Sequence, residues 1–143
     1  LAIRLSNLYL NMRGENERLA TIDLCSIDLF SGGASFYKYG ASPSFVKNRY
    51  CTEEVITGIS DSDTAKPLHY KPVTLSGGDF VIMITDGILE AFSLSGESHQ
   101  LLKFIESLET VNAQVMAESI LNEAKKRSQG KHDDMTVMVT RLW

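Results

Sequence analysis

One stretch of the hydrophobic pattern, residues 80–84, is apolar at every position. Turn-forming residues 76–79 precede it, and Asp86 and Gly87 follow it after a threonine. A short, continuous apolar run between turn signals predicts a strand that is buried on both faces, in the middle of a core. The carboxylate of Asp86 is therefore expected at the end of this strand, where we expect Gly87 to permit a sharp turn through a positive φ.

A hairpin is predicted before that strand. Residues 20–28 and 34–39 contain partly alternating apolar and polar positions with many β-branched or aromatic side chains, a pattern that favours strands. Residues 31–33, Ser-Gly-Gly, form a turn of hairpin type between them. The two strands are therefore expected to pair antiparallel, and residues 40–43 end the second of them.

The chain is expected to continue as a meander of short strands. After residues 44–47 it is predicted to turn into a short strand at residues 50–52. Residues 71–75 form a further strand, expected near a sheet edge because Pro72 has no N–H to donate to a ladder. The short connection that follows predicts that this strand pairs antiparallel with residues 80–84.

Helical periodicity marks the start of the chain and its last third. One face of a helix at the start is marked by Leu1, Leu5, Leu8 and Met12. Residues 88–92 predict a short helical piece. Two amphipathic helices follow, marked by Leu101, Leu102, Ile105 and Leu108 and then by Val115, Ile120 and Ala124. We expect Asn112 to be the N-cap of the second helix, Gly130 to follow its end, and residues 135–142 to form the last strand.

The order of the elements predicts the fold class. Strands come first and helices are grouped later, which favours an α+β fold, an antiparallel β-sandwich flanked by antiparallel helices, over a doubly wound parallel sheet. The two successive helices should form a hairpin over one sheet face. A length of 143 residues with 43% hydrophobic content predicts a single domain with an ordinary core.

Charge and composition exclude several classes of partner. The formal net charge is -4 and no basic face is evident in the sequence, so nucleic acid is not expected as a partner. The cluster Lys125, Lys126 and Arg127 is interpreted as the solvated last turn of a helix. Two cysteines without paired spacing favour a reduced, cytoplasmic compartment. No apolar run approaches the ~20 residues needed to cross a bilayer, so no membrane contact is expected from this segment.

Carboxylates stand at the ends of the two most apolar strands. Asp86 follows one strand, and Asp133 and Asp134 precede the other. If these strands are antiparallel neighbours, the carboxylates lie at the same end and can converge on a hard divalent cation such as Mg²⁺ or Mn²⁺. Helix capping or a turn role explains Asp86 equally well and Asp134 somewhat better. The spacing alone does not decide between these interpretations.

Other candidate sites have weaker support. Asp61 and Asp63 lack the glycine and distal glutamate of a calcium loop, so residues 58–66 are interpreted as a surface loop. His132, beside the aspartate pair, could be a ligand or a proton donor, but a solvated loop histidine is favoured, and His69 and His99 have no partner pattern. No serine lies in a Gly-x-Ser-x-Gly elbow, so nucleophilic acyl chemistry is not expected.

The sequence resembles the C-terminal part of the PPM family of metal-dependent serine/threonine phosphatases, in its sporulation branch. The resemblance is carried by residues 40–45, 78–88 and 133–137 and extends over essentially the whole chain. It implies a β-sandwich flanked by antiparallel helices and two Mn²⁺ or Mg²⁺ ions that position a water for attack on a phosphoserine or phosphothreonine. Asp86 matches the family's Asp-Gly metal ligand and Asp133 the aspartate of its terminal motif. No further catalytic side chain is implied.

The resemblance also implies what else the site and the protein require. The family also needs an aspartate on an early strand and an Asp-Gly-x-Gly motif, both of which would precede the segment that residues 1–143 match. Residues 1–143 are thus expected to be the C-terminal portion of one phosphatase domain, with about half of the metal site and little or no activity alone. The implied substrate is a phosphorylated anti-anti-sigma factor, and the implied full-length protein is anchored upstream in the membrane, with this segment on the cytoplasmic face.

Two alternative functions remain. A von Willebrand A type adhesion module also has Thr-Asp-Gly after an apolar strand, but it needs Asp-x-Ser-x-Ser on a parallel sheet, and residues 28–31 match that motif poorly. A non-catalytic protein-interaction domain could keep the phosphatase fold. The sequence leaves homodimer formation open.

Overall fold

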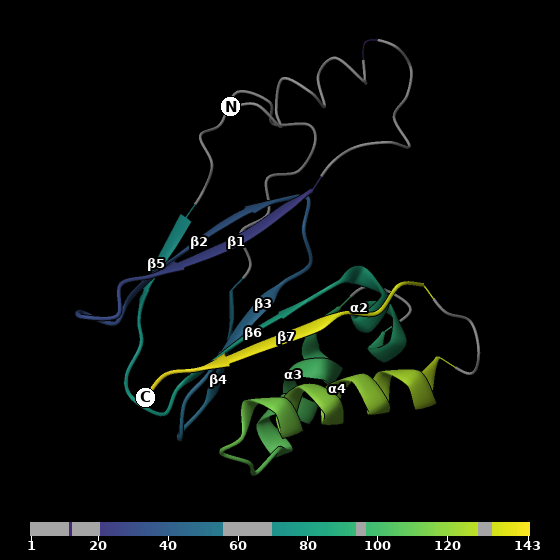
Figure 1. Cartoon of the computed structure of the whole chain (residues 1–143). Coiled ribbons are helices and arrows are strands. Elements are labelled where there is room, and N and C mark those ends of the chain that lie inside the picture. The colour runs from purple at the N-terminus through teal and green to yellow at the C-terminus, as the bar shows by residue number, and fades with distance from the viewer. Residues whose placement is uncertain (1–11, 13–20, 56–69, 94–96, 129–132) are drawn as a thin grey trace.

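The computed structural model describes residue 12 and residues 21–55, 70–93, 97–128 and 133–143. The strands are β1 (Ile22–Ile27), β2 (Gly33–Tyr39), β3 (Ser44–Lys47), β4 (Thr52–Val55), β5 (Tyr70–Thr74), β6 (Phe80–Ile84) and β7 (Val137–Arg141). The helices are α2 (Asp86–Phe92), α3 (His99–Ser107) and α4 (Ala113–Arg127). Two antiparallel sheets, ordered β1-β2-β5 and β4-β3-β6-β7, pack as layers, and the helices cover the outer face of the four-stranded sheet (Figure 1).

The strand β6 is buried on both faces, as its continuous apolar run predicts. All five of its residues are buried. Phe80, Ile82 and Ile84 belong to the core cluster shared with the helices, whereas Val81 and Met83 belong to the cluster between the two sheets. Because both faces of β6 are covered, this strand has no place for a polar residue until it ends.

The predicted hairpin of β1 and β2 is confirmed. The two strands pair antiparallel from Ile22 opposite Tyr39 to Ile27 opposite Ala34. Asp28 closes the turn, because its carboxylate accepts hydrogen bonds from the Phe30 N–H at 3.0 Å and the Ser31 hydroxyl at 2.6 Å. The carboxylate of Asp28 therefore has a structural role in this turn.

The predicted meander after residue 39 is wrong, because β2 and β3 lie in different sheets. Gly40 has a φ of 59° and redirects the chain at the end of β2. The short strand expected at residues 50–52 is β4, which begins only at Thr52. The side chain of Asn48 explains this shift, since its Oδ1 accepts from the N–H groups of Tyr50 and Cys51, both at 2.8 Å, and holds these residues in the turn.

The predicted hairpin between β5 and β6 is also wrong. The strand β5 lies at the edge of the described three-stranded sheet, as Pro72 predicts, but β6 pairs with β3 and β7 in the other sheet. The connection aligns with the end of the chain instead: Gly78 N–H donates to the Leu142 carbonyl at 3.0 Å, and Leu142 N–H donates to the Asp79 carbonyl at 2.9 Å. These bonds extend the pairing with β7 and direct the chain into the second sheet.

The predicted helix hairpin over one sheet face is confirmed, because α3 and α4 share one core cluster with the four-stranded sheet and Arg127 at the end of α4 donates to Gln100 at the start of α3 at 3.3 Å (Figure 1). Asn112 caps α4, because its Oδ1 accepts from the N–H groups of Gln114 at 2.9 Å and Val115 at 3.1 Å. Val115, one of the three residues that mark this helix in the sequence, is 47% exposed and lies outside the buried face of the helix. The buried face of α4 begins one position later and comprises Met116, Ile120 and Ala124.

Some predictions fall outside the described residues. These are the helix at residues 1–12, apart from the exposed Met12, and the features Asp61, Asp63, His69, Gly130 and His132. No helix in the described ranges is long and apolar enough to cross a membrane.

Candidate metal centre

The ends of β6 and β7 bring the predicted carboxylate segments together. The two strands pair antiparallel with Ile84 opposite Val137. Asp86 lies just beyond the end of β6, in the first turn of α2, and Asp133 and Asp134 lie just before the start of β7. The two segments, which are distant in sequence, therefore lie close together in the structure, as the sequence predicts.

Thr85 ties the two segments together beyond the sheet ladder. Its N–H donates to the Thr136 carbonyl at 3.1 Å, and its hydroxyl donates to the Asp134 carbonyl at 3.0 Å. The same hydroxyl oxygen accepts from the Thr136 N–H at 2.9 Å. Thr85 is the N-cap residue of α2, yet its side chain makes no capping bond to that helix. This role was not predicted from the sequence, because a threonine at a strand-to-helix junction is typical of a cap.

Gly87 is required for close approach, and the expected positive φ is wrong. The glycines with positive φ in the described ranges are Gly32, Gly40 and Gly78. A Cβ on Gly87 would instead lie 2.8 Å from the Asp134 carbonyl oxygen and 3.3 Å from the Asp133 Cβ. The absence of a side chain at this buried position lets the aspartate segment pack directly against the start of α2.

We expect Gly87→Ala to displace the segment of Asp133 and Asp134. Its added methyl group meets backbone atoms, which cannot rotate away as a side chain can, so the free energy of unfolding should fall by about 1–3 kcal/mol. Chemical denaturation measures this change. Gly33→Ala is the matched control, because its Cβ meets only the Ser31 hydroxyl oxygen, at 3.1 Å. Equal stabilities of the two variants would contradict a close approach at Gly87.

Each of the two candidate ligands has one carboxylate oxygen oriented by a protein donor. The Ser42 hydroxyl donates to Oδ1 of Asp86. The Asp134 N–H donates to Oδ1 of Asp133 at 2.9 Å. Within the described ranges, the Oδ2 atoms of both carboxylates have no hydrogen-bond partner in the protein, and both side chains are exposed. Oxygen donors of this kind fit Mg²⁺ or Mn²⁺, which prefer carboxylates and water.

The described residues supply only part of a ligand set. Among them, no group of three or more histidine, cysteine, aspartate or glutamate residues is arranged to hold a metal ion. Asp86 lies in the first turn of α2, where its negative charge also complements the helix dipole. Its side chain nevertheless bonds to Ser42, which lies outside that helix. Helix capping therefore does not account for its orientation.

A hollow of about 470 Å³ lies beside the aspartates. Its lining consists of Lys125, Asp133, Asp134 and Met135. Lys125 lies in the last turn of α4 and is exposed, as predicted for a solvated helix end. Its position beside Asp133 could not be inferred from the sequence, because the two residues belong to different elements. The hollow thus combines a cation with Asp133, one of the two candidate metal ligands.

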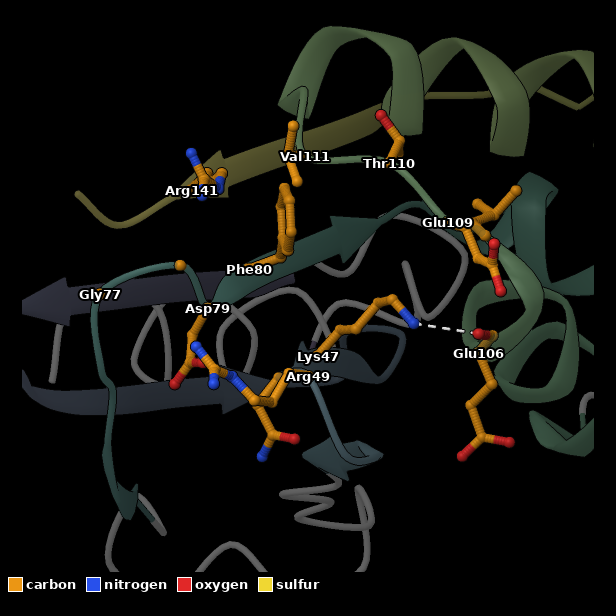
Figure 2. Close-up of a pocket in the computed structure, with 13 residues that line it drawn as sticks. Lys47, Arg49, Gly77, Asp79, Phe80, Glu106, Glu109, Thr110, Val111 and Arg141 are labelled. Atoms are coloured by element: carbon orange, nitrogen blue, oxygen red, sulfur yellow. Dashed lines mark hydrogen bonds between the residues drawn. The ribbon is translucent and has the colours of Figure 1, made fainter.

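A second hollow, of about 640 Å³, lies at the other end of β6 and β7 (Figure 2). Its lining includes Phe80, the first residue of β6, and Arg141, the last residue of β7. Figure 2 shows the amino group of Lys47 directed at the Glu106 carbonyl, to which it donates at 3.0 Å. Cations and anions line this hollow in equal number: Lys47, Arg49 and Arg141, and Asp79, Glu106 and Glu109. The hollow therefore favours neither a cationic nor an anionic ligand, and it lies away from the candidate metal ligands.

The adhesion-module alternative does not fit the structure. All strand pairs in the described ranges are antiparallel, whereas that module needs a parallel sheet. Asp28, the start of the weak motif match, closes a hairpin turn. Of the three histidines, His99 is the one described, and it is exposed at the start of α3.

Comparison with known proteins finds relatives over nearly the whole chain. The sequence model of the family described as Stage II sporulation protein E (SpoIIE) matches residues 2–143. Stage II sporulation protein E of Bacillus subtilis (strain 168) is 31% identical over 147 residues, which cover 99% of this chain and 18% of that protein. The protein of the same name from Priestia megaterium is 28% identical over 149 residues, covering 99% of this chain and 25% of that protein. The chain thus spans a quarter or less of the length of these curated relatives.

A solved structure supports the same relationship. The manganese-presoaked phosphatase domain of the cell fate determinant SpoIIE from Bacillus subtilis is similar, with a TM-score of 0.76 and 31% sequence identity. The match covers 99% of this chain and 65% of that chain. The α+β architecture of antiparallel sheets and helices predicted from the sequence is confirmed by this similarity.

Proposed function

This chain belongs to the stage II sporulation protein E family, and on that premise we propose that it forms the C-terminal portion of a metal-dependent protein serine/threonine phosphatase domain. The observation that carries the proposal is the placement of Asp86 and Asp133 at the same end of two paired strands, each with one oriented carboxylate oxygen. The similarity to a phosphatase domain presoaked with manganese supports it.

The residues of this chain would bind the metal ion and orient its ligands. Asp86 and Asp133 would hold a shared Mn²⁺ or Mg²⁺, while the Ser42 hydroxyl and the Asp134 N–H keep one oxygen of each carboxylate in place. The bound metal supplies a water of lowered pKa and neutralises charge on the phosphoryl oxygens. Lys125, on the wall of the adjoining hollow, attracts the negatively charged phosphoryl group of the substrate.

Two carboxylates alone make an incomplete metal site. A hard divalent cation takes about six oxygen ligands, and two carboxylates with water form a weak site. The remaining protein ligands would come from residues upstream of Leu1, so this chain alone holds about half of the site and is inactive or nearly so. We call this chain together with those upstream residues the complete domain.

The substrate and location are proposed from the family alone. The substrate is a phosphorylated anti-anti-sigma factor, whose dephosphorylation leads to release of a sporulation sigma factor. The full-length protein is anchored in the membrane upstream, with this segment on the cytoplasmic face. The family relationship supports this assignment, and the surface of the described residues adds nothing specific to it.

A protein-interaction domain without catalysis is the second candidate. Leu29 and Phe30, at the tip of the β1–β2 hairpin, are 84% and 104% exposed, and exposed apolar side chains at a turn favour contact with another protein. A binding module of this kind would retain its partner after Asp86→Asn, whereas an enzyme would lose turnover.

Metal removal tests the proposed function. We expect the complete domain to hydrolyse a phosphoserine peptide in Mn²⁺, to lose turnover after chelation with EDTA, and to regain it when Mn²⁺ is restored, because the attacking water depends on the metal. Phosphate release measures the reaction. Turnover that persists unchanged in EDTA would contradict a metal-dependent phosphatase.

A further inference from the structure

A serine in the crossing between the sheets contacts the candidate metal ligand. Ser42 lies in the connection from β2 to β3, and its side chain is only 7% exposed. A buried hydroxyl is costly unless it is hydrogen-bonded. The Ser42 hydroxyl finds its acceptor 44 residues away, at Oδ1 of Asp86. Asp86 itself is exposed, so a buried donor holds an exposed carboxylate.

The backbone that carries Ser42 is anchored to the other sheet. Two residues further on, Ser44 is fully buried, and its hydroxyl oxygen accepts from the Lys38 amino group at 2.8 Å. Lys38 is 1% exposed and forms an ion pair at 2.5 Å with Asp23, its cross-strand partner. Burial lowers the pKa of Lys38, and the hydrogen bond to Asp23 opposes that change.

The interactions of Ser44 with the three-stranded sheet restrict the position of Ser42. Lys38 and Asp23 belong to the three-stranded sheet, whereas Ser44 begins β3 of the four-stranded sheet. Between the two serines, Pro43 restricts the backbone because its ring fixes φ. The crossing segment is thus held to one sheet through Ser44 and to the start of α2 through Ser42.

We propose that Ser42 is a positioning residue for Asp86, an inference that rests on the proposed metal site. The Ser42 hydroxyl donates a hydrogen bond to Oδ1 of Asp86 and so prevents rotation of the carboxylate, which leaves Oδ2 in a fixed position to bind the metal. A hydrogen bond from a neighbouring group to a ligating carboxylate fixes its orientation, and the loss of such a partner weakens metal binding. The side chain of Ser42 itself contacts neither metal nor substrate.

Mn²⁺ binding to the complete domain tests this role. Ser42→Ala, and the similarly sized Ser42→Cys with its weak donor, should weaken Mn²⁺ affinity in calorimetric titration by about 10- to 100-fold. Saturating Mn²⁺ should restore most of the turnover. Ser42→Thr keeps the hydroxyl and should retain the affinity. Ser31→Ala is the matched control, since it removes a serine-to-aspartate bond of 2.6 Å in the β1–β2 turn and should leave Mn²⁺ affinity unchanged.

The outcomes separate this inference from the proposed function. Affinity that is unchanged in both Ser42→Ala and Ser42→Cys overturns the positioning role, and so does an equal loss in Ser42→Thr, which would indicate packing. If Asp86→Asn binds Mn²⁺ as tightly as the unsubstituted domain, the proposed metal site itself fails. Because Ser42→Cys nearly preserves the side-chain volume, it tests the hydrogen bond even if Ser42→Ala does not fold.

Discussion

Asp86→Asn is expected to lower the phosphatase turnover of the complete domain by more than ~100-fold, because it would remove the charge of a proposed metal ligand. The fold should survive, since Asp86 is exposed and its position in the first turn of α2 accepts an amide. Phosphate release from a phosphoserine peptide measures turnover, and circular dichroism measures the fold.

A carboxylate-to-amide change elsewhere provides the control. Glu109→Gln alters an exposed carboxylate beside the hollow at the opposite end of the four-stranded sheet, so it should leave turnover unchanged. If Asp86→Asn retains the turnover of the Glu109→Gln domain, Asp86 is not a metal ligand and its role is confined to the helix terminus.

The largest expected loss of stability is that of Phe45→Ala. Phe45 lies in β3, is fully buried, and pairs across the sheet with Ile82 at the centre of β6. Truncation removes most of an aromatic side chain from the core shared with the helices and leaves a cavity, which should cost about 3–5 kcal/mol. Chemical denaturation of the complete domain measures the free energy of unfolding.

An exposed phenylalanine makes the comparison specific to burial. Phe30 is 104% exposed at the tip of the β1–β2 hairpin, so Phe30→Ala should change the free energy of unfolding by less than about 0.5 kcal/mol. A similar loss in the two variants would mean that Phe45 does not occupy the core position assigned to it.

Local structure could be predicted because its signals are local. The apolar run of β6 and the Asn112 cap each depend on a few neighbouring residues, and both predictions are confirmed. The assignment of strands to sheets could not be predicted in this way. The connection at residues 76–79 has the length of a hairpin loop, yet the backbone hydrogen bonds that Leu142 makes with Gly78 and Asp79 direct it into the other sheet.

At the candidate site, too, features that depend on neighbouring residues could be predicted, whereas those that depend on distant residues could not. The segments of Asp86 and of Asp133 and Asp134 could be singled out because each lies next to a strongly apolar strand, but the choice of Asp86 and Asp133 as metal ligands came from the family resemblance. Ser42 was missed because a serine before a proline is typical of a turn, and its acceptor lies 44 positions away. The reason why a glycine is required at position 87 was predicted wrongly. The atoms that leave no room for a Cβ there belong to Asp134 and Asp133, which lie far along the chain.

Asp86 and Asp133 are proposed to hold one metal ion between them, and every other role assigned to the site depends on this. The most direct test is calorimetric titration of the complete domain with Mn²⁺, with and without Asp133→Asn. We predict two Mn²⁺ sites in the unsubstituted domain and the loss of one of them in the variant, because the two aspartates share a single ion of the pair. The same number of sites with the same affinities in both proteins would contradict a shared metal ion.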